Sequence, residues 1–298
     1  MSANESAPSL LTLAALPSTK SIPAPTLQEA LSTSPFLSQP IEGTFNLRDL
    51  GALPGSPISP GLFYRSGHLS SLSAEGKERL RDELGVRLVL DLRYEVERIS
   101  KPAPDIPGVE IVWIPPVGMG TPADLARFTS NSENGDGGDR GFTEMYLELV
   151  ELYAPVYKWV LSYLRDHYST PSSPEGNGSG RGILFHCTAG KDRTGILAAL
   201  LLTLAGAPYA TIAEDFVLTR VGMEPQKEFL QAVLLKWKPE WTVETPGWQE
   251  YTNIKRSHIL AFLAAMQTRY GGVEGFVQSQ LGFTSQEVGQ IQQVLRGA

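Results

Sequence analysis

The residues best suited to chemistry surround Cys187, the only cysteine of this 298-residue chain, which five residues separate from Arg193. The apolar run 182–185 before it is typical of a buried strand, and the run 196–202 after it is typical of a helix. The start of a helix offers unpaired N–H groups and a positive dipole end, which together bind anions. The same field favours the thiolate of Cys187, the form that attacks. We therefore predict a strand, a loop and a helix that hold a phosphate dianion against a nucleophilic sulfur.

Each residue type in this loop suits phosphate transfer. The planar fork of Arg193 can bind two phosphate oxygens, and Gly190 allows a tight turn. We expect Thr194 to hydrogen-bond the sulfur, and Lys191 to favour substrates with more negative charge than a lone phosphomonoester. Asp192 is the nearest group able to give a proton to the leaving oxygen. The predicted phosphate-binding residues are Thr188, Ala189, Gly190, Lys191, Arg193 and Thr194.

Simpler interpretations stay open at some of these positions. A lone cysteine is more often a small buried hydrophobe, although the Gly, Arg and Thr that follow in register favour an anion site. A helix cap explains Asp192 as well as an acid role does. We expect His186 to orient the loop rather than to act as a base. If a lid supplies the acid instead, the candidates are Asp91, Asp124, Asp136 and Asp139.

The stretch 186–195 resembles the signature loop of the cysteine-dependent tyrosine phosphatases. Its Gly-Lys-Asp-Arg-Thr core is similar to that of the atypical tyrosine/serine phosphatase family of bacteria and fungi. The resemblance covers roughly residues 40–298, with weaker similarities in the family's order at 46–51, 64–67, 91–97, 270–276 and 281–282. It implies that Cys187 is the nucleophile, Arg193 the phosphate ligand and Asp192 an acid within the loop. It also implies activity on phosphotyrosine, and some members act on phosphoserine, phosphothreonine or phosphoinositides.

Charged residues near other strand ends are candidates for a supporting role. Asp91 and Arg93 follow an apolar strand, and we expect them to brace the catalytic loop rather than to take part in the reaction. Arg48 lies near the first strands together with Asp49 and Arg65. Ion pairing on the surface, which contributes little, is the simpler interpretation of that second set.

The order of the predicted elements indicates an α/β fold, with a mostly parallel central sheet flanked by helices as in the cysteine-dependent phosphatases. Residues 1–25, rich in Ser, Pro and Ala, are expected to be flexible. Residues 26–298 are expected to form a single catalytic domain with a helical C-terminal part. The predicted strands are 41–47, 62–65, 86–92, 109–114 and 182–185, and the predicted helices are 26–31, 73–84, 142–168 with a break at Pro155, 196–202, 209–220, 225–236, 254–270 and one from 284 onward.

Composition excludes several classes of function. A net charge of -7 argues against nucleic acid as the main partner. One cysteine permits no internal disulfide and fits a reducing, cytoplasmic location. No apolar run approaches the roughly 18 residues of a transmembrane helix, and the apolar stretch 9–16 lacks the basic start of a secretory signal. The four histidines have no metal-ligand spacing, so we expect neither metal nor cofactor.

The leading hypothesis is a phosphomonoester hydrolase with a cysteinyl-phosphate intermediate, acting on phosphotyrosine or with dual specificity. Phosphoinositides are a second substrate class, suggested by Lys191. A small-molecule or lipid phosphate is a third, suggested by Trp237, Trp241 and Trp248, although aromatic residues near helices more often belong to the core. A phosphate-binding module without turnover and a rhodanese-like sulfur carrier are the alternatives from other classes.

Overall fold

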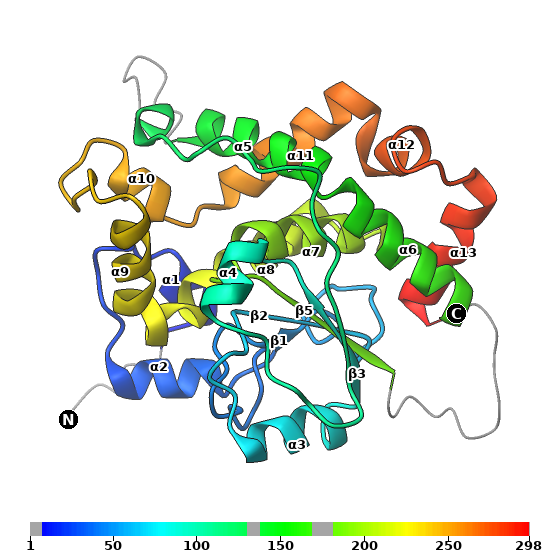
Figure 1. Ribbon diagram of the computed structural model, residues 1–298, viewed down its shortest axis with the longest axis horizontal. Coiled ribbons are helices and arrows are strands. Elements are labelled where there is room, and N and C mark those ends of the chain that lie inside the picture. Colours follow the sequence, from blue (N-terminus) through cyan, green and yellow to red (C-terminus); the bar gives the residue numbers. More distant parts are fainter. Residues whose placement is uncertain (1–7, 130–137, 169–180, 298) are drawn as a thin grey trace, which may run out of the picture.

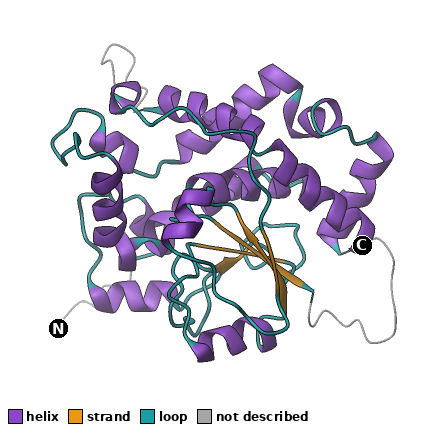
Figure 2. Ribbon diagram, viewed as in Figure 1, coloured by secondary structure: helices purple, strands orange, loops and turns teal. Residues whose placement is uncertain are grey.

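The computed structural model describes residues 8–129, 138–168 and 181–297, and it confirms an α/β fold with a mostly parallel central sheet flanked by helices (Figures 1 and 2). The strand order is β1-β2-β5-β3-β4, and only β1 runs antiparallel to its neighbour. The strands are β1 (Arg48–Asp49), β2 (Phe63–Ser66), β3 (Val86–Asp91), β4 (Glu110–Val112) and β5 (Gly182–His186).

The register of the three central strands brings their carboxyl ends together. His186 at the end of β5 pairs with Ser66 at the end of β2 and with Asp91 at the end of β3. Ligands bind beyond this edge in open α/β sheets, because the connecting loops and helix starts gather there. The chain from β5 to the next helix, which carries Cys187, therefore begins at the centre of that edge.

Helices cover both faces of the sheet (Figure 1). On one face, α3 packs under β3, and Ser73 caps its first turn as predicted. On the other face, α7 packs on β2 and β5 and is apolar on nearly every side, because further helices surround it. The helices are α1 (Leu10–Ala14), α2 (Ala24–Leu31), α3 (Ala74–Asp82), α4 (Glu95–Ser100), α5 (Asp139–Leu152), α6 (Ala154–Tyr168), α7 (Asp192–Ala205), α8 (Tyr209–Gly222), α9 (Lys227–Trp237), α10 (Trp248–Thr252), α11 (Arg256–Tyr270), α12 (Gly272–Ser279) and α13 (Ser285–Arg296), with short 3-10 turns η1 (Leu125–Phe128) and η2 (Glu224–Gln226).

Several local predictions are confirmed and one is wrong. The helix expected over 142–168 is interrupted beside Pro155, where α5 ends and α6 begins. Thr284 caps α13 in a capping box with Glu287. The strand expected over 41–47 is absent: this stretch turns, and only Arg48–Asp49 joins the sheet. Ile41 and Leu47 are buried, as a strand pattern would require. They lie in a loop, however, and pack into the core cluster that also contains Leu80 of α3.

The N-terminal segment differs from the flexible tail that its composition predicts. Residues 1–7 lie outside the described residues, but residues 8–25 run along the body of the protein. In this segment α1 packs against α8 and buries Leu13 and Ala14. Residues 130–137 and 169–180 also lie outside the described residues. No helix in the described ranges is both long and apolar enough to cross a membrane.

Candidate active site

The loop between β5 and α7 is fixed by its carbonyl groups. The carbonyl of Thr188 accepts the backbone N–H of His68 at 3.1 Å. The carbonyls of Ala189 and Gly190 accept the side-chain amide of Asn46 at 3.2 and 3.0 Å. In a planar trans peptide, a carbonyl and the following N–H point in opposite directions. The N–H groups of the next residues are therefore directed to the other side, and that of Gly190 donates to Cys187 Sγ at 3.2 Å.

Close backbone approach at this loop requires small residues and unusual dihedral angles. Gly190 has φ +70°, and a Cβ on it would lie 2.4 Å from the carbonyl oxygen of Ser66. Asn46, which holds the loop, also has a positive φ of 57°, a backbone conformation that is uncommon for residues other than glycine. Gly222 of α8 makes room for it, since a Cβ there would lie 2.3 Å from Asn46 Oδ1. The position of the loop thus depends on three points far apart in the sequence.

Beneath the loop lies a buried set of charges formed by Arg48, Arg65 and Asp215. Arg48 Nε donates to Asp215 Oδ1 at 2.9 Å, and Arg65 pairs with the other oxygen. Arg65 also donates to the Gly190 carbonyl at 2.8 Å. Burial acts to raise the pKa of Asp215, but Arg65 and Arg48 outweigh it and lower the pKa below its usual value. Burial, together with Arg65, lowers the pKa of Arg48 to about 10. Arg48 and Arg65 are thus buried and paired with Asp215, so the simpler alternative of a surface ion pair does not apply to them.

Arg193 is held in place by Glu97 of α4. Its Nη1 lies 2.5 Å from Glu97 Oε2 and its Nη2 lies 2.8 Å from Oε1, so the two groups form a bidentate pair. The hydroxyl of Thr188 also donates to Glu97. Burial acts to lower the pKa of Arg193, but Glu97 raises it well above the usual value. The guanidinium is therefore charged and oriented before any phosphate arrives.

His186, Asp91 and Arg93 form a second buried support, beside the first. Arg93 donates to both oxygens of Asp91 at 2.9 and 2.8 Å and to the carbonyl of Lys101 at 2.7 Å. Burial acts to raise the pKa of Asp91, but its hydrogen bonds to Arg93 and the neighbouring charges bring it down to about 2. Burial lowers the pKa of His186, so this ring is neutral at pH 7. That Asp91 and Arg93 brace the catalytic loop stays a prediction; they pair with each other, and Asp91 Oδ1 lies 3.9 Å from Nε2 of His186.

On the opposite side of the loop, Asp192 is only partly covered. The hydroxyl of Tyr146 donates to Asp192 Oδ1 at 2.7 Å. Lys191 Nζ lies 3.9 Å from Oδ1 of Asp192 and donates to the carbonyl of Tyr251 at 2.9 Å. The ammonium also sits 4.7 Å from the ring centroid of Phe142. Burial lowers the pKa of Lys191, against the attraction of Asp192. Lys191 therefore uses one of its three N–H donors on Tyr251, and its role as an added phosphate ligand stays a prediction.

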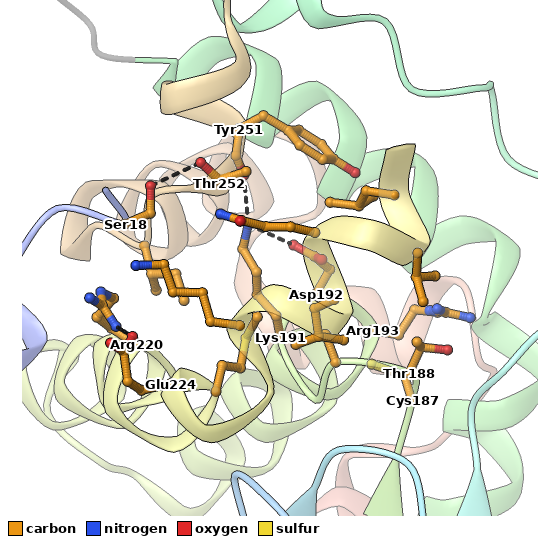
Figure 3. A pocket seen from close by; sticks show the side chains of 18 of the residues that line it. Ser18, Cys187, Thr188, Lys191, Asp192, Arg193, Arg220, Glu224, Tyr251 and Thr252 are labelled. Carbon is orange, nitrogen blue, oxygen red and sulfur yellow. Dashed lines mark hydrogen bonds and ion pairs between the residues drawn. The ribbon is translucent and has the colours of Figure 1, made fainter. Parts of the chain in front are cut away.

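The loop opens into a cavity of about 180 Å³ (Figure 3). Cys187, Thr188, Ala189, Lys191, Asp192 and Arg193 line one end of it. The side chain of Thr194 is buried, and its hydroxyl has no hydrogen-bond partner among the described residues, so the sulfur receives its bond from Gly190 and not from Thr194 as expected. The apolar wall comes from α9 and its neighbours, through Met223, Leu230, Val233, Leu234, Trp237 and Ile254.

Three of the other candidate acids, Asp91, Asp124 and Asp139, do not line this cavity. Asp91 is paired with Arg93, Asp124 caps η1, and Asp139 accepts a hydrogen bond from Ser257 at 2.7 Å. Asp136 lies outside the described residues. Of the described candidates, only Asp192 meets the cavity. Within the described ranges, no group of three or more His, Cys, Asp or Glu side chains could hold a metal ion.

The tryptophans of the segment 223–255 divide between two roles. Trp241 and Trp248 are buried in a small cluster with Leu125, which agrees with the core interpretation. Trp237, at the end of α9, is 53% exposed and lines the cavity. Of these three tryptophans, Trp237 is the one placed where it can touch a ligand.

A sequence model described as the tyrosine phosphatase family matches residues 39–297. The chain belongs to this family. A tyrosine-protein phosphatase of Nostoc commune is 29% identical over 249 residues, which cover 80% of this chain and 76% of that protein. A putative tyrosine-protein phosphatase of Cupriavidus necator is 29% identical over 246 residues, covering 79% and 81%. The triple specificity protein phosphatase PtpB of Mycobacterium tuberculosis is 28% identical over 198 residues, covering 59% and 67%.

Among solved structures, the core catalytic domain of the PP-IP phosphatase SIW14 from S. cerevisiae is similar at a TM-score of 0.33 and 15% identity, over 68% of this chain and 97% of that one. The family and its named relatives make this tyrosine phosphatase family member a cysteine-dependent phosphatase, that is, a hydrolase. Phosphorylated substrates fit that class.

Four residues that support the site were not assigned a role from the sequence. Glu97 and Asn46 lie inside segments that resemble the family, so the resemblance offered a signal for them. Tyr146 and Asp215 lie on α5 and α8, where nothing but helical apolar spacing marks the sequence. Their roles follow from contacts across 46 and 167 residues of chain, to Asp192 and Arg48, which local patterns do not encode.

Proposed function

We propose that this phosphatase works in two steps through a cysteinyl-phosphate. Cys187 Sγ attacks phosphorus, the bond to the leaving oxygen breaks, and Asp192 gives that oxygen its proton. Water then attacks the cysteinyl-phosphate, with Asp192 as the base, and releases inorganic phosphate. The observation that supports the proposal is that Cys187, Asp192 and Arg193, whose guanidinium is oriented by Glu97, line the same cavity.

The loop geometry supports both transition states. Donors that are fixed in advance stabilise developing charge without reorganising, and one such donor contributes on the order of 100- to 1,000-fold in rate. Arg193 is fixed by Glu97, and the loop amides are directed by the carbonyls pinned on the other side. The N–H of Gly190 on Cys187 Sγ favours negative charge on sulfur both before the attack and when sulfur departs.

The first test replaces the nucleophile. We expect Cys187→Ser to lower kcat for p-nitrophenyl phosphate by at least about 1,000-fold, because the hydroxyl is a far weaker nucleophile at neutral pH. The fold should persist, since the two side chains have nearly the same shape. Turnover retained by the folded variant would contradict the proposal, and it would favour a site elsewhere. Phosphate bound without turnover by the native protein would instead favour a binding module.

The second test concerns the acid. We expect Asp192→Asn to lower kcat/KM, which reports the step in which the leaving group departs, most for phenyl phosphate, whose leaving group needs a proton, and least for p-nitrophenyl phosphate, whose leaving group does not. The difference between the two losses should be on the order of 10- to 100-fold. A matched control is Asp139→Asn, since Asp139 lies outside the cavity. Equal losses for both substrates would place the acid on another residue.

Phosphotyrosine in proteins is the substrate that we propose first, because the relatives are named tyrosine-protein phosphatases. The apolar wall of α9 favours an organic body that is itself apolar or aromatic. Phosphoinositides are the second class, because Lys191 lines the cavity and keeps N–H donors beside its bond to Tyr251. Comparing kcat/KM over phosphotyrosine, phosphoserine and phosphothreonine peptides, inositol lipids and small phosphates ranks these classes. The expected cytoplasmic location is a further part of this proposal.

A further inference from the structure

The end of the cavity that lies away from the sulfur is closed by the N-terminal segment. Ser18 lines the cavity together with the catalytic loop, although the family match begins only at residue 39. In Figure 3, Ser18, Arg220 and Glu224 lie together on the side of the pocket opposite Cys187, with Asp192 between them. This wall is therefore a part of the pocket that the matched family region does not contain.

On the α8 side, a buried ion pair fixes the backbone of this segment. Arg220 Nη1 lies 2.5 Å from Glu224 Oε2, and both side chains are almost fully buried. Arg220 donates to the carbonyl of Leu16 at 3.1 Å and to that of Lys20 at 2.5 Å. Glu224 Oε1 accepts the N–H of Ile22 at 2.7 Å. Charge-assisted bonds to buried backbone groups hold a chain in one conformation more firmly than neutral ones.

On the α10 side, Ser18 itself makes the contacts. Its N–H donates to Asn253 Oδ1 at 2.8 Å, and its hydroxyl shares a hydrogen bond of 2.9 Å with Thr252. The neighbouring Tyr251 carbonyl holds Lys191 of the catalytic loop at 2.9 Å. Residues 16–22, named here the N-terminal wall, thus join α8 to α10 across the end of the pocket.

The size of the cavity relates this wall to substrate length. A cavity of about 150 Å³ holds one benzene ring, and the whole cavity, phosphate end included, is about 180 Å³. The cavity is partly open, so a substrate can extend beyond this volume, and the residues that line it outside the catalytic loop include Leu230, Leu234 and Ser18. We propose that the N-terminal wall determines substrate length: it favours phosphomonoesters whose apolar body is one aromatic ring with a short extension that contacts Ser18.

This inference rests on the proposed function, and its test separates chain length from chemistry. Phenyl phosphate and 4-butylphenyl phosphate have nearly the same leaving group and differ in length. We expect kcat/KM to be at least tenfold higher for the butyl compound, mainly through KM, because the extension buries apolar surface. Ser18→Trp, which fills the end of the cavity, should remove this preference. Thr19→Trp, at the exposed neighbouring position, should keep it.

A measurement on the native protein guards against a misfolded Ser18 variant. Saturating 4-butylphenylphosphonate, which is not hydrolysed, should slow hydrogen exchange at the amides of Ser18 and Ile22, whereas phenylphosphonate should not. Equal exchange with both ligands, or a length preference that survives in folded Ser18→Trp, overturns the inference. These outcomes are distinct from a failure of the proposed function, because binding of the phosphonates does not need Cys187 to react, and Cys187→Ser tests that chemistry separately.

Discussion

The two sides of the catalytic loop are built on opposite principles. On the scaffold side, the carbonyls of Thr188, Ala189 and Gly190 each have a donor, and Asp215 pairs with both Arg48 and Arg65 out of water. On the pocket side, the sulfur and Asp192 have one close partner each, and they face a cavity. The comparison teaches that the loop carbonyls are hydrogen-bonded on the scaffold side, and that this directs the loop N–H groups toward the pocket.

The scaffold side positions the loop rather than adding much net stability. Removing charges from water is costly, and a buried pair offsets that cost only with close geometry and further hydrogen bonds. Breaking such a set is nevertheless damaging, because the partners that remain are charged, buried and uncompensated. Substitutions behind the loop should therefore lower the free energy of unfolding, whereas substitutions in front of it should lower the rate.

The largest effect is expected for Asp215→Asn. The variant leaves the side chains of Arg48 and Arg65, both fully buried, without a counter-charge. We expect the free energy of unfolding to fall by about 3–5 kcal/mol, the range for breaking a buried ion pair. Urea unfolding followed by circular dichroism measures it.

The control for this change lies on the same helix. Glu214 is partly exposed, and its Oε1 lies 3.5 Å from Nη2 of Arg256. A solvent-exposed pair of this kind contributes little, so Glu214→Gln should change the free energy of unfolding by less than about 1 kcal/mol. Asp192→Asn is the counterpart on the pocket side and should lower the rate while keeping the unfolding midpoint. Equal stability losses from Asp215→Asn and Asp192→Asn would remove the distinction between the two sides.

The next effect concerns pH and His68, whose backbone N–H holds Thr188 from the scaffold side. Burial, aided by Lys101 and Arg93, lowers the pKa of His68 from 6.5 to about 4. Because the unfolded chain binds this proton more readily, the stabilisation is complete above about pH 6.5 and is lost as the pH falls toward 4. The loss amounts to at most about 3 kcal/mol.

The variant His68→Phe tests this dependence. Neither ring nitrogen of His68 has a hydrogen-bond partner among the described residues, and its ring packs edge-on against Phe45 and Phe229. A phenyl ring therefore keeps the packing and loses no bond. Between pH 7 and pH 4.5, the free energy of unfolding should fall less in the variant than in the native protein. His186 also has a lowered pKa, so part of the dependence should persist. Identical slopes for both proteins would contradict the assignment.

The sequence predicted the pocket side of the loop better than the scaffold side. Strand, loop and helix around Cys187 follow from periodicity and glycine positions within about twenty residues, and the structure has all three. The scaffold side was only half anticipated. Arg48 was a candidate for a supporting role, but surface pairing of Arg48 and Arg65 stayed open, because no local pattern places Asp215 between them.

Residues 1–25 and 41–47 show two further limits of local patterns. A Ser-, Pro- and Ala-rich stretch predicts flexibility, yet residues 8–25 are bound by Arg220 and Glu224, which lie about 200 residues away in the chain. The apolar residues of 41–47 alternate as in a strand, but the sheet edge is occupied by Arg48–Asp49. In both places tertiary contacts decide the local structure, and the local sequence pattern does not encode those contacts.

The smallest effect, and the sharpest probe of the pocket side, is expected for Tyr146→Phe. The hydroxyl of Tyr146 is the close partner of Asp192, at 2.7 Å, and a single hydrogen bond contributes about 0.5–1.5 kcal/mol. We expect kcat/KM for phenyl phosphate to fall by about 2- to 10-fold, because Asp192 loses its fixed orientation, and kcat/KM for p-nitrophenyl phosphate to change less. Tyr157→Phe is the matched control, since the buried hydroxyl of Tyr157 has no partner among the described residues. A loss shared by both variants would mean that packing, and not the bond to Asp192, is responsible.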